Sequence, residues 1–195
     1  MSVIFGIKNK DNLVIAGDRR GSTKSGETIS DNIKKVKMIN NQVAIATAGN
    51  AAIEVAITNS IENITDINSL TTDDVVTIIS EFYGKVQNAK VSFILSLPFV
   101  FIVAGNGKNG HPSLISGVFS KGILSASEVP MVLFHPEDTS QNVCNNIFAK
   151  YYHTDYNNFV EKTISDVSKL SNLVSSNGDK WIYSYYSKTG CLLSF

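Results

Sequence analysis

The sequence predicts an α+β fold in which two antiparallel sheets stack face to face and a pair of helices covers the outer face of each. Three observations support this prediction. Short β-rich runs and segments with helical apolar spacing follow the order strands, two helices, strands, two helices, strands. Turn-forming clusters separate neighbouring strands, as antiparallel hairpins require. Each helix pair carries an apolar stripe that it can bury against a sheet.

Length and charge narrow the class of protein. A chain of 195 residues, 43% of them hydrophobic, can bury one sizeable core but is short for two complete domains. We therefore expect a single domain over residues 1–195. The chain has 17 basic residues (Lys and Arg together) and 17 acidic residues (Asp and Glu together). This charge balance gives no reason to expect a nucleic acid or an anionic membrane as a partner.

The cysteines and the apolar runs favour a cytoplasmic protein. Cys144 and Cys191 lie far apart in the sequence and match no metal-ligand spacing. Because neither looks like part of a disulfide framework, they favour a reducing, intracellular environment. The amino terminus lacks the basic segment and apolar core of a secretory signal. The longest apolar run, residues 91–104, is interrupted by polar residues and proline and is shorter than the roughly 20 residues that cross a bilayer.

In the first half of the chain, two hairpins precede two helices. The predicted strands are residues 2–8, 13–17, 36–39 and 43–47. Residues 21–31 are polar and are expected to form loop and a short strand. Apolar spacing predicts a helix over residues 51–64, and Thr71 and Asp74 resemble a capping box for the next one. That helix keeps its spacing through Phe93, and Pro98 must end it.

The second half repeats the order. The predicted strands are residues 99–104, 114–119, 123–124, 181–186 and 191–195, and the predicted helices are residues 138–152 and 156–173. Residues 105–110 satisfy a G-x-G-x-x-G spacing, but no helix follows them, so we predict a hairpin turn rather than a dinucleotide site.

Ser2 is the first candidate functional residue. A small residue behind the initiator Met is of the kind that becomes the amino terminus once Met1 is removed. A terminal Ser carries a nucleophilic hydroxyl and a basic α-amine, whose reference pKa is about 7.7 to 8.0, on one residue. Ser is also common at this position in ordinary proteins, so the hypothesis needs support from the rest of the chain.

That support comes from four runs of sequence. They are GIK (6–8), LVIAGDRR (13–20), SDNIKKV (30–36) and ATAG (46–49). Together they resemble proteasome-type β-subunits, which are N-terminal nucleophile (Ntn) hydrolases with a four-layer αββα sandwich fold. The resemblance is close over residues 2–50 and looser beyond them.

The resemblance implies four catalytic residues. Ser2 matches the terminal nucleophile, Asp18 the acid, Lys35 the lysine and Gly49 the residue whose N–H binds the oxyanion. A lysine ammonium near the α-amine would lower the pKa of that amine, and Asp18 would hold the lysine in place. Lys35 and Gly49 match only if one extra residue is inserted between residues 21 and 31.

The resemblance also implies a substrate pocket and a supporting segment. Thr47, Ala51 and Val55 match positions that line the family's specificity pocket. Proteasome subunits support the amino terminus with a Gly-Ser-Gly segment and a later Asp-x-x-Ser-Gly. Residues 132–138 contain no serine, and the second motif is reduced to Asn172 and Ser175, which would give weaker support.

Simpler interpretations exist for several of these residues. Asp18 beside Arg19 and Arg20 would also fit a solvated ion-pair cluster, and Lys35 would fit an ordinary member of a basic run. The acidic and histidine residues between 135 and 155 match no metal-ligand spacing, and Asp138 is better explained as a helix cap. Cys144 fits a packed core cysteine.

Three hypotheses for function follow. The first is a proteasome-like peptidase that forms a homo-oligomeric ring and cleaves peptides or unfolded proteins with Ser2, using no cofactor or metal. The second is an amidohydrolase of the same fold that acts on a small amide. The third is a catalytically inactive ring or scaffold subunit. Substrate preference, ring size and any ATPase partner are left open by the sequence.

Overall fold

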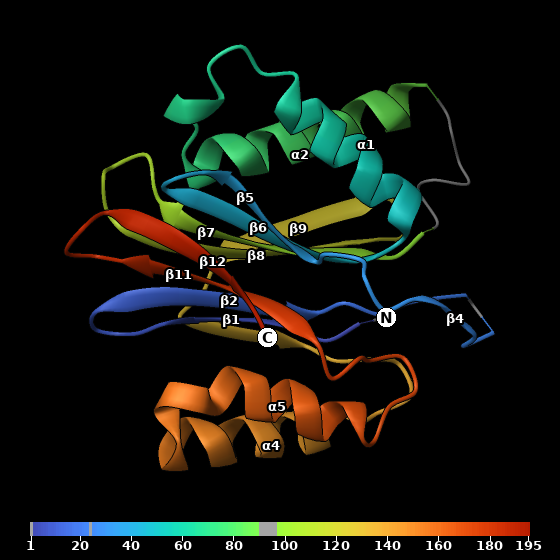
Figure 1. The fold of residues 1–195 in the computed structure, drawn as a ribbon. Coiled ribbons are helices and arrows are strands. Elements are labelled where there is room, and N and C mark those ends of the chain that lie inside the picture. Colours follow the sequence, from blue (N-terminus) through green and yellow to red (C-terminus); the bar gives the residue numbers. More distant parts are fainter. Residues whose placement is uncertain (1, 24, 90–96) are drawn as a thin grey trace.

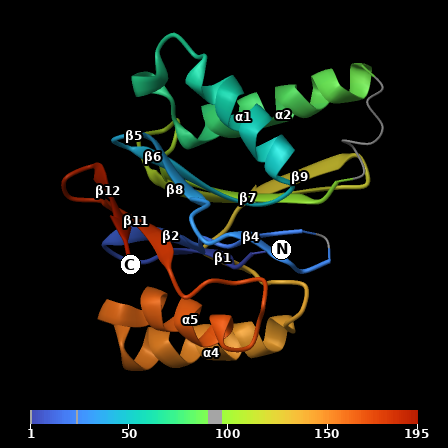
Figure 2. The same cartoon turned by 45° about the vertical axis from the view of Figure 1, so that its right-hand side comes forward.

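The computed structural model describes residues 2–23, 25–89 and 97–195. Two sheets of five strands each stack face to face, and a helix layer covers the outer face of each (Figure 1 and Figure 2). The predicted αββα sandwich is therefore confirmed. None of the helices in the described ranges is long and apolar enough to cross a membrane.

The first sheet joins the two ends of the chain. Its strand order is β10-β1-β2-β11-β12, and all neighbouring strands are antiparallel. The strands are β1 (Ile4–Lys8), β2 (Asn12–Asp18), β10 (Met131–Phe134), β11 (Gly178–Ser184) and β12 (Thr189–Ser194). Because β2 pairs with β11, Asp18 lies opposite Gly178 although the two are far apart in sequence.

The second sheet is a meander taken from the middle of the chain. Its strands, in spatial order, are β5 (Val36–Asn40), β6 (Val43–Gly49), β7 (Phe99–Asn106), β8 (Pro112–Ser120) and β9 (Ile123–Glu128). A short hairpin of β3 (Gly21–Ser22) and β4 (Thr28–Ser30) lies apart from both sheets. The predicted turn over residues 105–110 is confirmed, since β7 and β8 pair on either side of it.

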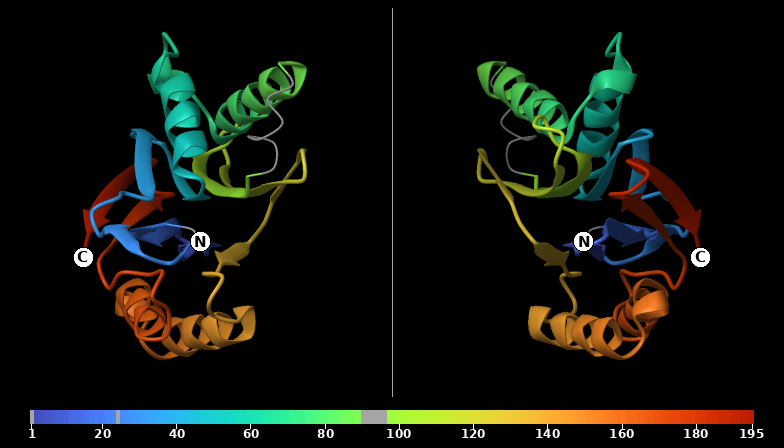
Figure 3. Two further views of the ribbon diagram at one scale, coloured as in Figure 1. Left: turned by 90° about the vertical axis from the view of Figure 1, so that its right-hand side faces the viewer. Right: turned by 90° about the vertical axis from the view of Figure 1, so that its left-hand side faces the viewer.

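Helices cover the two outer faces. The second sheet packs against α1 (Ala51–Glu62) and α2 (Thr72–Asn88), and the first sheet against α4 (Gln141–Thr154) and α5 (Phe159–Ser168). Figure 3 shows the layers along the sheets, with the helix pairs on opposite sides. The capping box of Thr71 and Asp74 is confirmed at the start of α2. Two short 3-10 helices, Ile67–Ser69 and Tyr156–Asn158, complete the elements among the described residues.

Strand β2 shows why the central strands are apolar on both faces. Alternate side chains of a strand point to opposite faces of the sheet. Leu13 and Ile15 pack between the sheets, while Val14 and Ala16 pack against the α4–α5 layer. A strand that lies between a second sheet and a helix layer has no solvent face, so its sequence is a continuous apolar run rather than an alternation.

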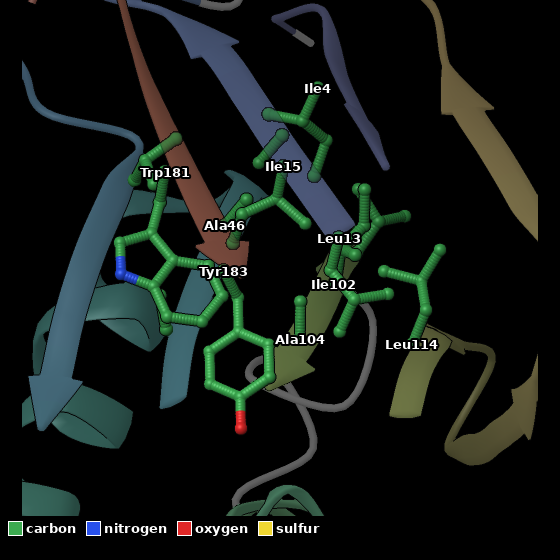
Figure 4. Packing of buried hydrophobic residues seen from close by; sticks show 13 residues of the cluster. Ile4, Leu13, Ile15, Ala46, Ile102, Ala104, Leu114, Trp181 and Tyr183 are labelled. Carbon is green, nitrogen blue, oxygen red and sulfur yellow. The ribbon is translucent and has the colours of Figure 1, made fainter. Parts of the chain in front are cut away.

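Aliphatic and aromatic side chains fill the space between the sheets. Ile4, Leu13 and Ile15 of the first sheet face small and branched residues of β6, β7 and β8, with Trp181 and Tyr183 beside them (Figure 4). The sheets approach closely at Gly6, where a Cβ would lie 2.9 Å from Cδ1 of Leu114. A larger residue at this position would separate the two sheets locally.

Three details of the sequence prediction are wrong. Strand β10 was not predicted. Helix α4 begins later than residue 138, and its cap is Ser140, whose hydroxyl accepts from the Val143 N–H, rather than Asp138. Helix α5 ends at Ser168, five residues before the predicted end at 173. The predicted continuation of the second helix to Phe93 lies outside the described residues, as does Met1.

Candidate active site

Asp18 lies at the centre of the candidate site, at the end of β2. Its carboxylate is fully buried and accepts hydrogen bonds from three backbone N–H groups, those of Val3 (3.1 Å), Arg20 (2.7 Å) and Ser175 (3.2 Å). The Asp18 N–H donates in turn to the carbonyl of Val3 at 3.2 Å. One side chain therefore joins the amino terminus, the end of β2 and a loop near the carboxyl end of the chain.

Ser2 is held next to this carboxylate. The residue is 7% exposed, and its hydroxyl donates to the carbonyl of Arg20 at 3.2 Å. The peptide that follows Ser2 is fixed because the Val3 N–H donates to Asp18. The position of the hydroxyl is thus determined by two contacts with the segment of residues 18–20.

Lys35 approaches the site from the other sheet, just before β5. It is buried, whereas Lys34 is exposed and Lys37 pairs with Glu54 at 3.1 Å. Its backbone carbonyl accepts from the Thr47 N–H at 3.0 Å. Gly17 leaves room for the lysine, because a Cβ there would lie 3.0 Å from Cβ of Lys35. Lys35 is therefore not an ordinary member of the basic run.

The contact between Lys35 and Asp18 is electrostatic rather than direct. The positive charge of Lys35 lowers the pKa of Asp18 through space. Within the described parts of the chain, however, no ion pair joins the two side chains. The expectation that Asp18 holds the lysine in place therefore stays a prediction. A backbone hydrogen bond from the Thr47 N–H fixes the main chain at Lys35.

The environment of Asp18 makes it an unusual carboxyl group. Burial raises its pKa to about 6, and it outweighs the lowering by the three N–H donors and by Lys35. Removing a carboxylate from water costs more than these dipoles and one distant charge return. The group is therefore placed to change its charge near neutral pH.

Gly49 ends β6 immediately before α1. Its φ is +125°, and a Cβ would lie only 2.4 Å from the carbonyl oxygen of Pro98. Both facts exclude a larger residue here. Asn50 then caps α1 by accepting from the N–H groups of Ala52 and Ile53, so Gly49 lies where a strand passes into a helix.

The three predicted pocket residues lie in different surroundings. Ala51 and Val55 are exposed and lie one turn apart on the same face of α1. Thr47 is buried on β6, and its hydroxyl finds no hydrogen-bond partner in the described chain. A groove of about 710 Å³ between β10 and α4 is lined by other residues. The pocket assignment remains a prediction.

The two supporting residues contribute through the backbone more than was expected. Ser175 donates its N–H to Asp18, and its hydroxyl accepts from the Arg19 N–H at 3.0 Å and donates to the Asn177 carbonyl at 2.7 Å. The Asn172 carbonyl accepts from Nη1 of Arg20 at 3.1 Å. A main-chain group at residue 175 thus reaches the acid although the expected motif is absent.

The two arginines beside Asp18 have other partners. Arg19 pairs with buried Asp179 through two hydrogen bonds, of 2.8 and 2.5 Å, and Arg20 pairs with Asp31 through bonds of 2.6 and 3.0 Å. The interpretation of Asp18 as part of a solvated ion-pair cluster is therefore wrong.

The contacts of two acids in the second half could not be predicted correctly from the sequence. Asp179 shares its strand face with Trp181 and Tyr183, and an acid at a core-facing position signals a buried cation partner. Asp138 gave no comparable signal, because its partners, Ser171 and Asn172, lie on a distant loop. No group of three or more possible metal ligands occurs among the residues that the structure describes.

Comparison with known proteins supports the resemblance noted in the sequence. The family model described as "Proteasome subunit" matches residues 2–117, which is more than half of the chain. The match includes Ser2, Asp18, Lys35 and Gly49 but not the loop that carries Ser175. A search of the curated proteins found none that matches the chain.

Proposed function

Because the chain belongs to the proteasome subunit family of Ntn hydrolases, we propose that it is a peptidase whose nucleophile is the hydroxyl of Ser2 after removal of Met1. One observation carries the proposal. The chain fixes Ser2 beside a fully buried carboxylate by hydrogen bonds from Val3 N–H to Asp18 and from Ser2 Oγ to the Arg20 carbonyl.

The proposed reaction uses both groups of the terminal serine. The α-amine accepts the hydroxyl proton while Oγ attacks the peptide carbonyl carbon. The Gly49 N–H donates to the oxyanion that forms, in a position where such donors are worth about a hundredfold or more in rate. The amine product leaves with the proton, and water then hydrolyses the ester to release the acid.

Lys35 and Asp18 would tune this reaction. An ammonium group near the α-amine disfavours its protonated form and so lowers its pKa toward neutral pH. Asp18 would balance the charge of Lys35 and hold the first peptide group of the chain. Thr47, Ala51 and Val55 would contact the substrate side chain, which favours small to medium residues.

The proposed assembly rests on the family. Proteasome family subunits form oligomeric rings, which supports a ring for this chain. We propose a homo-oligomeric, cytoplasmic ring in which residues 1–195 of each subunit form one domain, with peptides or unfolded proteins as substrates. Any ATPase partner remains open.

A second candidate is a catalytically inactive ring subunit. The sequence favours it because residues 132–138 contain no serine and an amide, Asn172, stands where the family has an acid. This candidate needs no free α-amine, so it is also compatible with retention of Met1.

The deciding experiment combines intact mass with peptide hydrolysis. We expect loss of Met1 and cleavage of short fluorogenic peptide amides, and we expect Ser2→Ala to lower kcat/KM by more than about a thousandfold. Ser2→Thr should retain activity because it keeps a hydroxyl and the amine. The matched control is Ser127→Ala, on an exposed position of β9. Retention of Met1 with no hydrolysis by the assembled protein would favour the inactive subunit.

A further inference from the structure

Two connections meet at one end of the α4–α5 layer. One joins β10 to α4 and contains Asp138, and the other follows α5 and leads into β11 (Figure 1 and Figure 2). Residues 171–177 of this second connection are called the support loop. The Asp138 carboxylate accepts from the Ser171 hydroxyl at 2.6 Å and from the Asn172 N–H at 3.0 Å. The first connection thus supplies an acid to a loop that has none.

The partners on both sides are well fixed. Nδ1 of His135 lies 2.8 Å from the carbonyl oxygens of both Pro136 and Thr139, which closes the segment that carries Asp138. On the support loop, Ser171 is buried, and its hydroxyl also accepts from the Leu173 N–H at 3.1 Å. Asp138 itself is exposed on its other side, so its contribution depends on these two directed bonds.

The support loop connects these bonds to the candidate site. Three residues after Asn172, the Ser175 N–H donates to Asp18. The Asn172 carbonyl accepts from Arg20, whose own N–H donates to Asp18 and whose carbonyl accepts from Ser2. Hydrogen bonds and the covalent chain between them therefore connect Asp138, through the support loop, to the acid and the nucleophile.

We propose that Asp138 is a positioning residue that fixes the support loop so that the Ser175 N–H stays directed at Asp18. The inference rests on the proposed function, in which Asp18 supports Ser2. Asp138 does not contact the reacting atoms and acts only through the loop. In the proteasome family the acid of the Asp-x-x-Ser-Gly motif supports this region, and Asn172 stands in its place here. Asp138, from a different segment, would supply part of that support.

Loss of this anchor has a specific electrostatic consequence. The Ser175 N–H is one of the groups that lower the pKa of Asp18, in opposition to burial. If the Ser175 N–H turns away while the loop continues to bury Asp18, that pKa rises above its present value near 6, and Asp18 becomes protonated at a higher pH. Two other charged side chains act on Asp18, those of Lys35 and Arg20. Arg20 pairs with Asp31 and also bonds to the support loop through the Asn172 carbonyl.

The test compares Asp138→Ala, Asp138→Asn and Ser171→Ala in the assembled, full-length protein. Two measurements do not depend on activity: amide hydrogen exchange at Ser175 and NMR titration of the Asp18 carboxyl group. We expect Asp138→Ala to speed exchange at Ser175 by about tenfold, as loss of a hydrogen bond to a charged group allows, and to raise the pKa of Asp18. Asp138→Asn should change the exchange at Ser175 and the pKa of Asp18 less than Asp138→Ala does, because it keeps an acceptor oxygen.

Activity supplies a third readout. We expect kcat/KM to fall about tenfold in Asp138→Ala, mostly in kcat, with the acidic limb of the pH profile moved to higher pH. Glu62→Ala, at the exposed end of α1, is the control for loss of one carboxylate. Ser171→Ala should repeat the loop effects and keeps the test decisive if Asp138→Ala does not fold.

Unchanged exchange at Ser175 and an unchanged titration of Asp18 in both Asp138→Ala and Ser171→Ala would overturn the inference. The proposed function fails by a different result, namely hydrolysis that survives Ser2→Ala. Because exchange and titration are measured without substrate, the two failures are separable.

Discussion

Asp18 and Asp179 are both fully buried and lie next to each other on paired strands, yet their surroundings differ in kind. Asp179 is held by the Arg19 guanidinium and by the Ser194 hydroxyl. Asp18 is held by backbone N–H groups, with the nearest cationic influence coming from Lys35. Asp179 is therefore a buried acid whose charge is balanced by an arginine, whereas Asp18 is a buried acid whose charge is stabilised mainly by backbone dipoles.

The two surroundings move the pKa in opposite directions. Burial alone would raise the pKa of Asp179, but the hydrogen bonds from Arg19 and Ser194 and the charges of Arg19 and Lys34 outweigh it and lower the pKa. For Asp18, burial wins and the pKa rises to about 6. The ion pair with Arg19 thus keeps the pKa of Asp179 below its usual value, whereas the N–H dipoles around Asp18 do not offset its burial. The first arrangement suits a structural role and the second a reactive site.

The largest effect is expected when the ion pair is broken. Asp179→Asn leaves Arg19, 19% exposed in its side chain, without its carboxylate. Loss of one partner of a buried pair typically costs between about 3 and 5 kcal/mol of unfolding free energy. Urea denaturation measures this change, with Glu62→Gln on the surface as the control for charge. A loss below about 1 kcal/mol would mean that the pair is not what holds this end of the sheet.

The pH dependence of stability should separate the two acids most clearly. The folded-state pKa of Asp18 lies above the unfolded value, so the stability that this group contributes is complete below pH 3.8 and is lost as the pH rises through about 6. The shift corresponds to about 3 kcal/mol. For Asp179 the sign is opposite, because its lowered pKa contributes stability that is lost as the pH falls below its unfolded pKa.

Unfolding free energies of Asp18→Asn, Asp179→Asn and the parent between pH 3.5 and 7.5 would measure these opposite slopes. Relative to the parent, Asp18→Asn should gain stability as the pH rises from about 4 to 6, and Asp179→Asn should gain as the pH falls. Parallel curves for the parent and Asp18→Asn would contradict the raised pKa.

The fold could be predicted from the sequence more fully than the contacts of Asp18 could. The strands, the helix pairs and the hairpin order could be predicted, because turns and apolar periodicity are local signals. Asp18 and Lys35 could be assigned by resemblance. The Ser175 N–H could not, because a backbone donor 157 residues from its acceptor leaves no trace in side-chain pattern.

Strand β10 and Asp138 escaped prediction for related reasons. Met131–Phe134 has only four residues and lies at the edge of its sheet, so it shows no alternation of buried and exposed positions. Asp138 precedes a helix, where a cap is the usual role of an acid. The neighbouring Ser140 satisfies the helix instead, which leaves Asp138 available for the support loop.

Gly17→Ala would perturb the residue between the two acids. A Cβ at this position would lie 2.9 Å from Cγ2 of Ile4 and 3.0 Å from Cβ of Lys35. We expect a loss of about 1 to 3 kcal/mol from overpacking. If Lys35 is displaced, NMR titration should show a further rise in the pKa of Asp18 with no change at Asp179. Gly84→Ala is the control, since a Cβ there meets no atom within 4 Å. Equal effects at both glycines would exclude the proposed crowding of Lys35.

The smallest effect is expected at the second arginine. Asp31 pairs with Arg20 as closely as Asp179 pairs with Arg19, but its side chain is 43% exposed. Exposed ion pairs contribute less than about 1 kcal/mol, because water and salt screen them. Asp31→Ala should therefore lower the unfolding free energy by less than about 1 kcal/mol in urea denaturation, and the loss should shrink in high salt. A loss of unfolding free energy as large as that of Asp179→Asn would show that the geometry of an ion pair, rather than its burial, determines its strength. Exposure to solvent would then not explain a difference between the Arg19–Asp179 and Arg20–Asp31 pairs.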